Sequence, residues 1–329
     1  MASFPLLLLP FVAMEHVLCM LSPFELIDVS LASSRAKKAV KNFSKTQQKF
    51  SVTFLNNWLS IVFCRGQMLW IYAILNQEQA NRDVQINWNG NTGEVRKKRS
   101  EEPLKDIMKW FDHAREVLNC KINNLTLTLY SSSIENRQTI DWIAAQNQTM
   151  EIMTISNNYK ESDDDLKYLM ERIHVSGDFF LKVDRYKDNF WMEIPRKLNY
   201  LHIENSEFIE FEQLLSVESP TIILRKSILT SQEINRFLKS WMSCETHLEL
   251  KALEISISGP DAMNEIMDLP HEKTNDPNLV KAFLDYPHYV DVENDMFTIK
   301  QSDEKKRATV TVAPQASFDD YWSFYLIVH

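Results

Sequence analysis

An apolar pattern with the spacing apolar-x-x-apolar-x-apolar recurs along the chain from residue 122 onward. Full copies begin at Ile122, Met150, Leu198 and Leu250, and partial copies, which lack the first apolar position, lie at Leu181/Val183 and Ile222/Leu224. The second apolar position falls at residues 125, 153, 181, 201, 222 and 253, so the steps are 28, 28, 20, 21 and 31 residues. Repeats of this length are units that bury their apolar side only against their neighbours, which predicts a stack of similar units.

Stretches with helical apolar spacing lie between the copies, at residues 136–146, 162–173, 208–215 and 230–242. Ser162 and Thr230 are each followed by acidic residues within three positions, which is typical of a helix start. A strand followed by a helix, repeated near the ~20–29 residue period of leucine-rich repeats, predicts an α/β fold, α+β overall. The larger part of the chain is then a leucine-rich-repeat-like strand–helix solenoid.

Side chains at alternate positions of a strand face opposite ways, so the residues between the buried apolar positions are predicted to face solvent on a concave sheet. These substrate-binding candidates are Thr126, Thr128, Thr154, Ser156, Lys182, Asp184, His202, Glu204, Glu254 and Ser256. The set mixes hydroxyls with both charges, which suits a protein surface better than a small apolar ligand. The alternative is that these positions are solvated strand faces with no ligand.

Residues 9–43 have the spacing of a small helical module, with apolar residues mostly three to five positions apart. The stretch Ser22-Pro23-Phe24-Glu25 predicts a helix start. Ser22 would be the N-cap, Pro23 the first helical residue, and Glu25 would reach back to the cap. Three helices are predicted here, followed by a domain of another type.

This arrangement resembles the F-box, the module by which substrate receptors dock on the Skp adaptor of cullin-type ubiquitin ligases. The resemblance implies an adaptor-binding surface formed or supported by Leu9, Pro10, Val17, Leu18, Leu21, Pro23, Glu25, Leu26 and Val29. The run 11–14 departs from the pattern, because many F-boxes carry a polar residue there. The alternative is an ordinary helical hairpin that closes one end of a domain.

The C-terminal region predicts three short strands, at residues 296–299, 308–312 and 324–328, with a hairpin turn at 302–306. Together with the repeats and the helix that bears Trp241, it resembles the F-box-associated type 2 domain over residues 120–328. That family usually has Asp-Gly in this turn, whereas Glu304 follows Asp303 here, so a different turn geometry is expected.

Residues 50–88 are rich in β-branched and aromatic residues and predict strands. The apolar stretch 58–75 predicts two strands around a turn and not a membrane helix, because Arg65 lies near its centre. Residues 89–93 predict a loop. The basic run 96–99 predicts a solvated linker, because Glu101 and Glu102 offset its charge; a nuclear localisation patch is the alternative.

Enzyme and cofactor signatures are absent from the sequence. Its five glycines form no phosphate-binding motif, its four cysteines form no C-x-x-C pair, and its eight histidines show no metal-ligand spacing. A net charge of −9 disfavours nucleic-acid binding. We therefore expect no cofactor, no metal, no catalytic residue, no nucleic acid and no membrane partner, and an intracellular protein, cytoplasmic or nuclear.

The predicted organisation has three parts: a helical module at 1–48, a β-rich connecting segment at 49–119 and a repeat-like substrate-binding domain at 120–329. The resemblance implies a non-enzymatic substrate receptor that binds a Skp-family adaptor, through it a cullin scaffold, and a target protein that the sequence does not identify. The alternative is a repeat scaffold that binds a protein without recruiting a ligase, and a hydrolase with an unfamiliar site is a third hypothesis.

Overall fold

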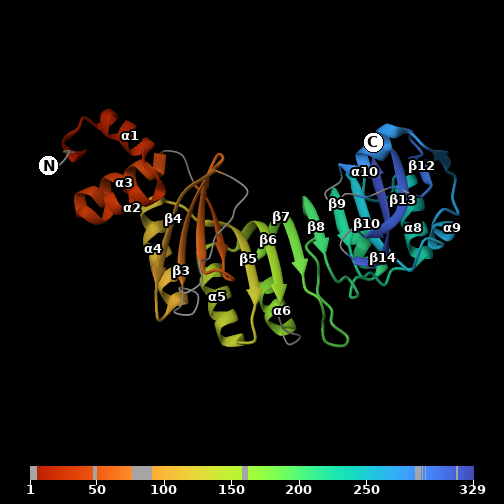
Figure 1. Cartoon of the computed structure of the whole chain (residues 1–329), viewed down its shortest axis with the longest axis horizontal. Coiled ribbons are helices and arrows are strands. Elements are labelled where there is room, and N and C mark those ends of the chain that lie inside the picture. Colours follow the sequence, from red (N-terminus) through yellow and green to blue (C-terminus); the bar gives the residue numbers. More distant parts are fainter. Residues whose placement is uncertain are drawn as a thin grey trace. The chain divides into compact units, whose positions relative to one another are not determined.

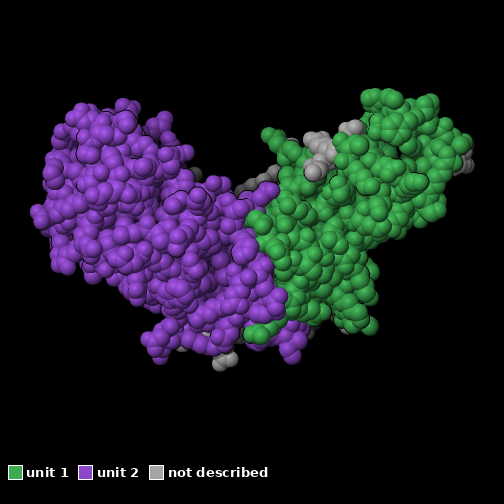
Figure 2. All heavy atoms as spheres, turned by 180° about the vertical axis from the view of Figure 1, so that it is seen from behind, with its two compact units in different colours: residues 1–128, 137–150 green, residues 129–136, 151–329 purple. Residues whose placement is uncertain are grey.

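The computed structural model describes residues 6–46, 50–75, 91–157, 162–285, 290, 292, 294–315 and 318–329. The chain divides into two compact units, drawn in two colours in Figure 2. Unit 1 comprises residues 1–128 and 137–150, and unit 2 comprises residues 129–136 and 151–329.

Unit 1 begins with helices, as predicted: a short 3-10 helix η1 (Leu6–Leu8), then α1 (Phe11–Met20), α2 (Pro23–Ala32) and α3 (Ser34–Thr46). The predicted start of α2 is confirmed. The Ser22 hydroxyl accepts a hydrogen bond from the Glu25 backbone N–H at 3.2 Å, and the Ser22 backbone N–H donates to the Glu25 carboxylate at 2.7 Å. This capping box satisfies two backbone donors that a helix start otherwise leaves unpaired.

The remainder of unit 1 is a sheet with two helices. Its elements are β1 (Ser51–Leu55), β2 (Ser60–Arg65), β3 (Met68–Leu75), β4 (Asn91–Arg99), α4 (Pro103–Leu118), β5 (Ile122–Leu129) and most of α5 (Ser133–Gln146). The strand order is β5-β1-β2-β3-β4. The two strands predicted within 58–75 are confirmed as β2 and β3, and Gly66 between them has φ +61°, a left-handed conformation that suits glycine.

The basic run 96–99 is not a linker, and this prediction is corrected. It forms the end of β4, which pairs in parallel with β3, and residues 91–93 of the predicted loop also belong to β4. The backbone of this run hydrogen-bonds to the edge of β3, while its charged side chains still reach solvent. Arg96 forms ion pairs with Asp28 at 2.8 Å and Glu94 at 2.6 Å.

Unit 2 alternates strands and helices and ends in antiparallel strands (Figure 1). Its elements are β6 (Thr149–Asn157), α6 (Asp163–Arg172), β7 (His174–Lys182), β8 (Tyr200–Ile203), α7 (Phe211–Ser216), β9 (Thr221–Leu224), α8 (Ser231–Met242), β10 (Ala252–Ile257), α9 (Ala262–Ile266), β11 (Glu272–Thr274), α10 (Pro277–Leu284), β12 (Met296–Lys300), β13 (Arg307–Gln315) and β14 (Phe318–Val328). The strand order is β6-β7-β8-β9-β10-β14-β13-β12-β11. Strands β7, β8, β9 and β10 pair in parallel, whereas β14 pairs with β10 and β13 antiparallel.

The predicted mixed α/β class and the order of strands and helices are confirmed, but a leucine-rich-repeat solenoid is not. The second apolar positions Leu201, Ile222 and Leu253 are register partners across β8, β9 and β10, as the repeat predicts. The copy at 181 is assigned two residues too late, because Phe179, not Leu181, pairs with Leu201.

The three C-terminal strands and their hairpin turn are confirmed as β12, β13 and β14. Glu304 in the turn has φ +59°, the left-handed region that a glycine adopts readily. The turn therefore keeps a glycine-like backbone although a glutamate occupies the position.

Candidate protein-docking surfaces

The N-terminal helices expose five large apolar side chains, which we call the exposed apolar set. It consists of Leu8, Phe11, Val12, Met20 and Leu31, each between 64% and 76% exposed. These residues come from η1, α1 and α2, within the first 31 residues of the chain. Five large apolar side chains exposed within one small module make it a candidate for a surface that another molecule covers.

The residues predicted to bind an adaptor fall into three groups. Leu18, Pro23 and Leu26 are buried and can only support the surface from below; Leu18 and Leu26 are part of the core. Leu9, Val17, Leu21 and Val29 are half-buried. Pro10 and Glu25 are exposed, although Glu25 is engaged in the cap of α2.

Helix α2 packs on the sheet of unit 1 through Phe24, which is completely buried. Its ring meets Phe63 of β2 at 6.3 Å, Tyr72 of β3 at 6.4 Å and Trp110 of α4 at 6.2 Å between ring centroids, all edge to face. Such pairs stabilise beyond their buried area. The helices therefore share a core with the sheet and are not a free-standing module, while the exposed apolar set faces solvent.

The ten side chains predicted to face solvent on the sheet differ widely in exposure. Lys182 and Asp184 are exposed. Half-buried side chains are those of Thr126, Thr154, Ser156 and Glu204. The prediction of solvent exposure is wrong for the remaining four, which are buried: Thr128, His202, Glu254 and Ser256.

Helix α10 accounts for part of this burial. Phe283 of α10 packs in one apolar cluster with Ala252 of β10 and Tyr325 of β14. Ala252 and Glu254 share a face of β10, and Tyr325 is the register partner of Glu254. A sheet face that alternation alone assigns to solvent is thus covered by a later segment of the chain.

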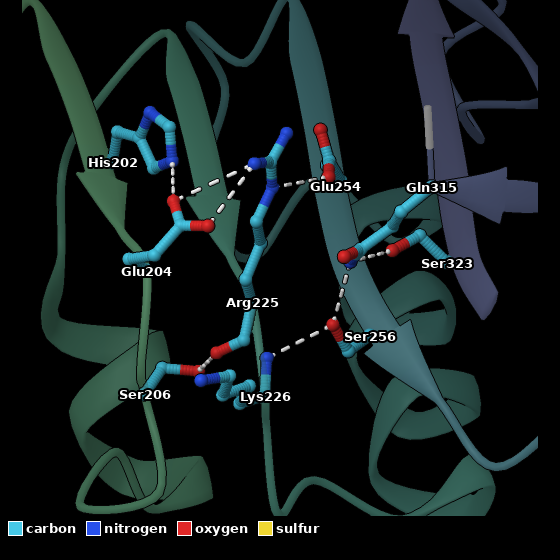
Figure 3. A network of polar contacts seen from close by, with 9 residues as sticks. All are labelled: His202, Glu204, Ser206, Arg225, Lys226, Glu254, Ser256, Gln315 and Ser323. Carbon is cyan, nitrogen blue, oxygen red and sulfur yellow. Dashed lines mark hydrogen bonds and ion pairs between the residues drawn. The ribbon is translucent and has the colours of Figure 1, made fainter. Parts of the chain in front are cut away.

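A charged network links β8, β9 and β10 on this face (Figure 3). Arg225, directly after β9, donates from Nε to Glu254 Oε1 at 3.1 Å and from Nη1 to Glu204 Oε1 at 3.3 Å. His202 Nε2 lies 3.0 Å from Glu204 Oε2. The sequence patterns did not identify Arg225 as a site residue. It could have been found as an arginine directly after a buried strand, with acidic residues in the corresponding parts of the neighbouring copies, Glu204 after β8 and Glu254 in β10.

The two carboxylates of the network have opposite pKa shifts. Hydrogen bonding from His202 and the charge of Arg225 lower the pKa of Glu204 to about 2, against the opposing effect of burial. Burial raises the pKa of Glu254 above its ordinary value although Arg225 opposes the shift. Glu254 Oε2 has no hydrogen-bond partner among the described residues. The network holds charges at fixed positions, with no nucleophile paired to a base, so its chemistry suits positioning or recognition.

A second, uncharged group extends the network across β10, β13 and β14 (Figure 3). The amide nitrogen of Gln315 donates to Ser256 Oγ at 2.9 Å and to Ser323 Oγ at 2.7 Å. Ser256 Oγ also accepts the backbone N–H of Lys226 at 3.0 Å. All these side chains except Lys226 are buried, so they fix the strands to one another.

The described residues contain no group of three or more His, Cys, Asp or Glu side chains that could hold a metal ion. None of the helices in the described part of the chain is both long enough and apolar enough to span a bilayer.

Comparison with known protein families decides what the two regions are. Residues 6–48 match the F-box domain, and residues 191–255 match the F-box-associated domain family. The chain carries an F-box and an F-box-associated domain. No curated protein and no solved structure matches the chain.

The F-box comprises η1, α1, α2 and α3 and contains the whole exposed apolar set. F-box domains generally bind Skp-family adaptors. The F-box-associated match begins in the segment before β8 and ends within β10. It therefore contains all four residues of the charged network, His202, Glu204, Arg225 and Glu254.

Proposed function

We propose that this chain is the substrate-recognition subunit of a Skp–cullin–F-box ubiquitin ligase. The F-box binds a Skp-family adaptor, the adaptor connects to a cullin, and the F-box-associated domain holds a target protein. The chain itself performs no catalysis. It acts by proximity, because binding raises the effective concentration of target lysines near the conjugating enzyme.

The exposed apolar set supports this proposal most directly. Its five side chains lie in the region that matches the F-box, and α2, which carries Leu31, packs on the sheet through Phe24. Burying such side chains against a partner removes apolar area from water, which is the main favourable term in most protein association. A rigid, preformed surface also loses little conformational freedom on binding.

Co-purification of a Skp-family adaptor with the full-length chain tests the proposal. Phe11→Asp combined with Val12→Asp should abolish adaptor binding, since both side chains are about two-thirds exposed and their replacement leaves the core intact. Leu9→Ala with Pro10→Ala should abolish it as well. Ile134→Asp is the matched control, because Ile134 is 82% exposed and lies in α5, outside the F-box.

The alternative is a protein-binding scaffold that recruits no ligase, with N-terminal helices that only close the sheet. The packing of Phe24 on Phe63, Tyr72 and Trp110 is what such a cap would show. The two functions differ in one outcome. A cap predicts that the wild-type chain and the Phe11→Asp/Val12→Asp variant retain equal, negligible amounts of adaptor.

Target binding is proposed for the F-box-associated domain, as a leucine-rich-repeat-like arrangement of parallel strands and helices. Of the predicted positions, Glu204 is partly accessible within the matched residues 191–255. Before this region, Lys182 and Asp184 are accessible at the end of β7, and Thr126, Thr154 and Ser156 are partly accessible. We propose a cytoplasmic or nuclear location, where ubiquitin ligases of this type act.

A further inference from the structure

A groove of about 660 Å³ lies in unit 2, where three neighbouring parallel strands begin. It is lined by the segments that precede β8, β9 and β10, at residues 197–199, 217–220 and 245–250, together with Leu215 at the end of α7. All of these residues lie within the region that matches the F-box-associated family. The volume is typical of ligand-binding pockets, which span about 300–1,000 Å³.

The lining of the groove is apolar at its base. Leu198, Val217 and Leu250 are buried there, and Leu215 is half-buried. Leu248, in contrast, is 50% exposed at the groove. The half-exposed Leu248 and the apolar base of the groove together provide a surface onto which another apolar side chain can pack.

Main-chain hydrogen bonds fix the three segments to one another, so the groove is preformed. The Leu198 N–H donates to Glu218 O at 3.1 Å, and the Lys251 N–H donates to Pro220 O at 2.7 Å. In the third segment, the Leu250 N–H donates to His247 O at 3.0 Å, and the His247 ring meets Phe237 of α8 at 4.9 Å between centroids. Burial lowers the pKa of His247, which leaves the ring neutral at pH 7.

The charge at the groove is negative. Three carboxylates, those of Glu218, Glu245 and Glu249, line it together with one ammonium, that of Lys197. With His247 neutral, the lining carries a charge of −2, and the Lys306 ammonium, which donates to Leu248 O, reduces the local charge to −1. Glu245 accepts a hydrogen bond from Ser240, whereas Glu218 and Glu249 are exposed and form no ion pair with any described residue. These two carboxylates are therefore available to a cationic group from another molecule.

We propose that this groove binds a short segment of the target protein in which an apolar side chain stands next to Lys or Arg. The apolar side chain packs against Leu248 and the base of the groove, and the cation meets Glu218 and Glu249. Anionic ligands are disfavoured by the charge. The inference rests on the proposed function, since it assigns a chemistry to the target that the F-box-associated domain holds.

Selection of 12-residue peptides from a random display library on the full-length chain tests this inference. Enriched peptides should carry Leu, Ile or Phe beside Lys or Arg. One enriched peptide is then synthesised. Its affinity for the Leu248→Asp chain should be about ten-fold or more below its affinity for the wild type, because burying one leucine side chain typically contributes that much. Glu218→Lys with Glu249→Lys should have at least as large an effect. Because this variant reverses the charge of the groove, added salt should weaken binding to the wild type but strengthen binding to the variant.

Glu171→Lys is the matched control, since Glu171 is an exposed carboxylate of α6 away from the groove. Enrichment of acidic or uncharged peptides, equal affinity in Leu248→Asp, or no enrichment at all would each overturn the inference. Adaptor binding measured on the same proteins keeps the two proposals apart. A chain that binds the adaptor but selects no such peptide refutes only the groove, and a chain that selects the peptide but no adaptor refutes the ligase function.

Discussion

Replacing Phe24 with alanine should release the F-box from the sheet of unit 1. Phe24 is fully buried and touches three aromatic rings, and the Arg96 guanidinium lies 4.8 Å from its ring centroid. Fully buried Phe→Ala changes typically cost 3–5 kcal/mol. Because these ring contacts come from two strands and a helix that cannot all move into the space, we expect about 4 kcal/mol. Phe24→Leu, which keeps most of the volume, should cost about 1.5 kcal/mol or less.

Hydrogen exchange on the full-length chain is the suitable assay, because it reports opening free energies element by element. A loss of about 4 kcal/mol lowers the protection of α2, β2 and β3 by roughly a thousand-fold, since every ~1.4 kcal/mol is a factor of ten. Strands β8, β9 and β10 of unit 2 serve as the internal reference. A loss below about 1 kcal/mol in Phe24→Ala would refute the shared core and would mean that the N-terminal helices fold independently.

Three further predictions concern single side chains. Glu304→Gly should raise the free energy of unfolding by up to about 1 kcal/mol in urea denaturation, because Glu304 has φ +59°; an unchanged or lower value would contradict the strain. Ser22→Ala should cost about 1 kcal/mol and increase exchange at the start of α2, since it removes the cap; unaltered exchange there would argue against it. Glu204→Gln should make the free energy of unfolding less dependent on pH between pH 5 and 2. The pKa of Glu204 is about 2 in the folded chain and ordinarily 4.5. Ionised Glu204 therefore contributes at most about 3 kcal/mol to the free energy of unfolding above pH 4.5, and this contribution is lost as the pH falls towards 2. Parallel curves of unfolding free energy against pH for the variant and the wild type from pH 5 to 2 would refute this.

Local signals in the sequence predicted the elements well where a single physical cause determines them. The capping box at Ser22 and Glu25, the turn at Gly66 and the helix start at Thr230 all appear in the structure. The period of the apolar pattern placed Leu201, Ile222 and Leu253 in register across three strands. In each case the residues involved are close in sequence or repeat with a fixed period.

Predictions failed where a distant segment decides the outcome. Alternation along β10 assigned Glu254 to solvent, but α10 and β14 cover that face, and no pattern within β10 records their position. The composition of the run 96–99 is typical of a linker, but the run forms a strand because its backbone pairs with the edge of β3. Both errors have the same cause, since tertiary contacts override local propensity.

The F-box was located correctly as a region, but the sequence did not predict which of its side chains are exposed. Helical spacing identifies apolar positions without stating which side of each helix packs inward. Leu18 and Leu26 face the core, while Phe11 and Val12, in the run that departs from the family pattern, face solvent. Phe24 inserts into the aromatic cluster and so determines which side of α2 packs inward.

A hydrogen-exchange footprint of a purified Skp-family adaptor on the full-length chain tests the central claim most directly. The account predicts a complex in which the amides of η1, α1 and the first turns of α2 gain protection, while those of β8, β9 and β10 do not change. The Phe11→Asp/Val12→Asp chain should show no such gain at the same adaptor concentration. Absence of any complex with the wild-type chain, or protection confined to the sheet with the N-terminal helices unaltered, would contradict it.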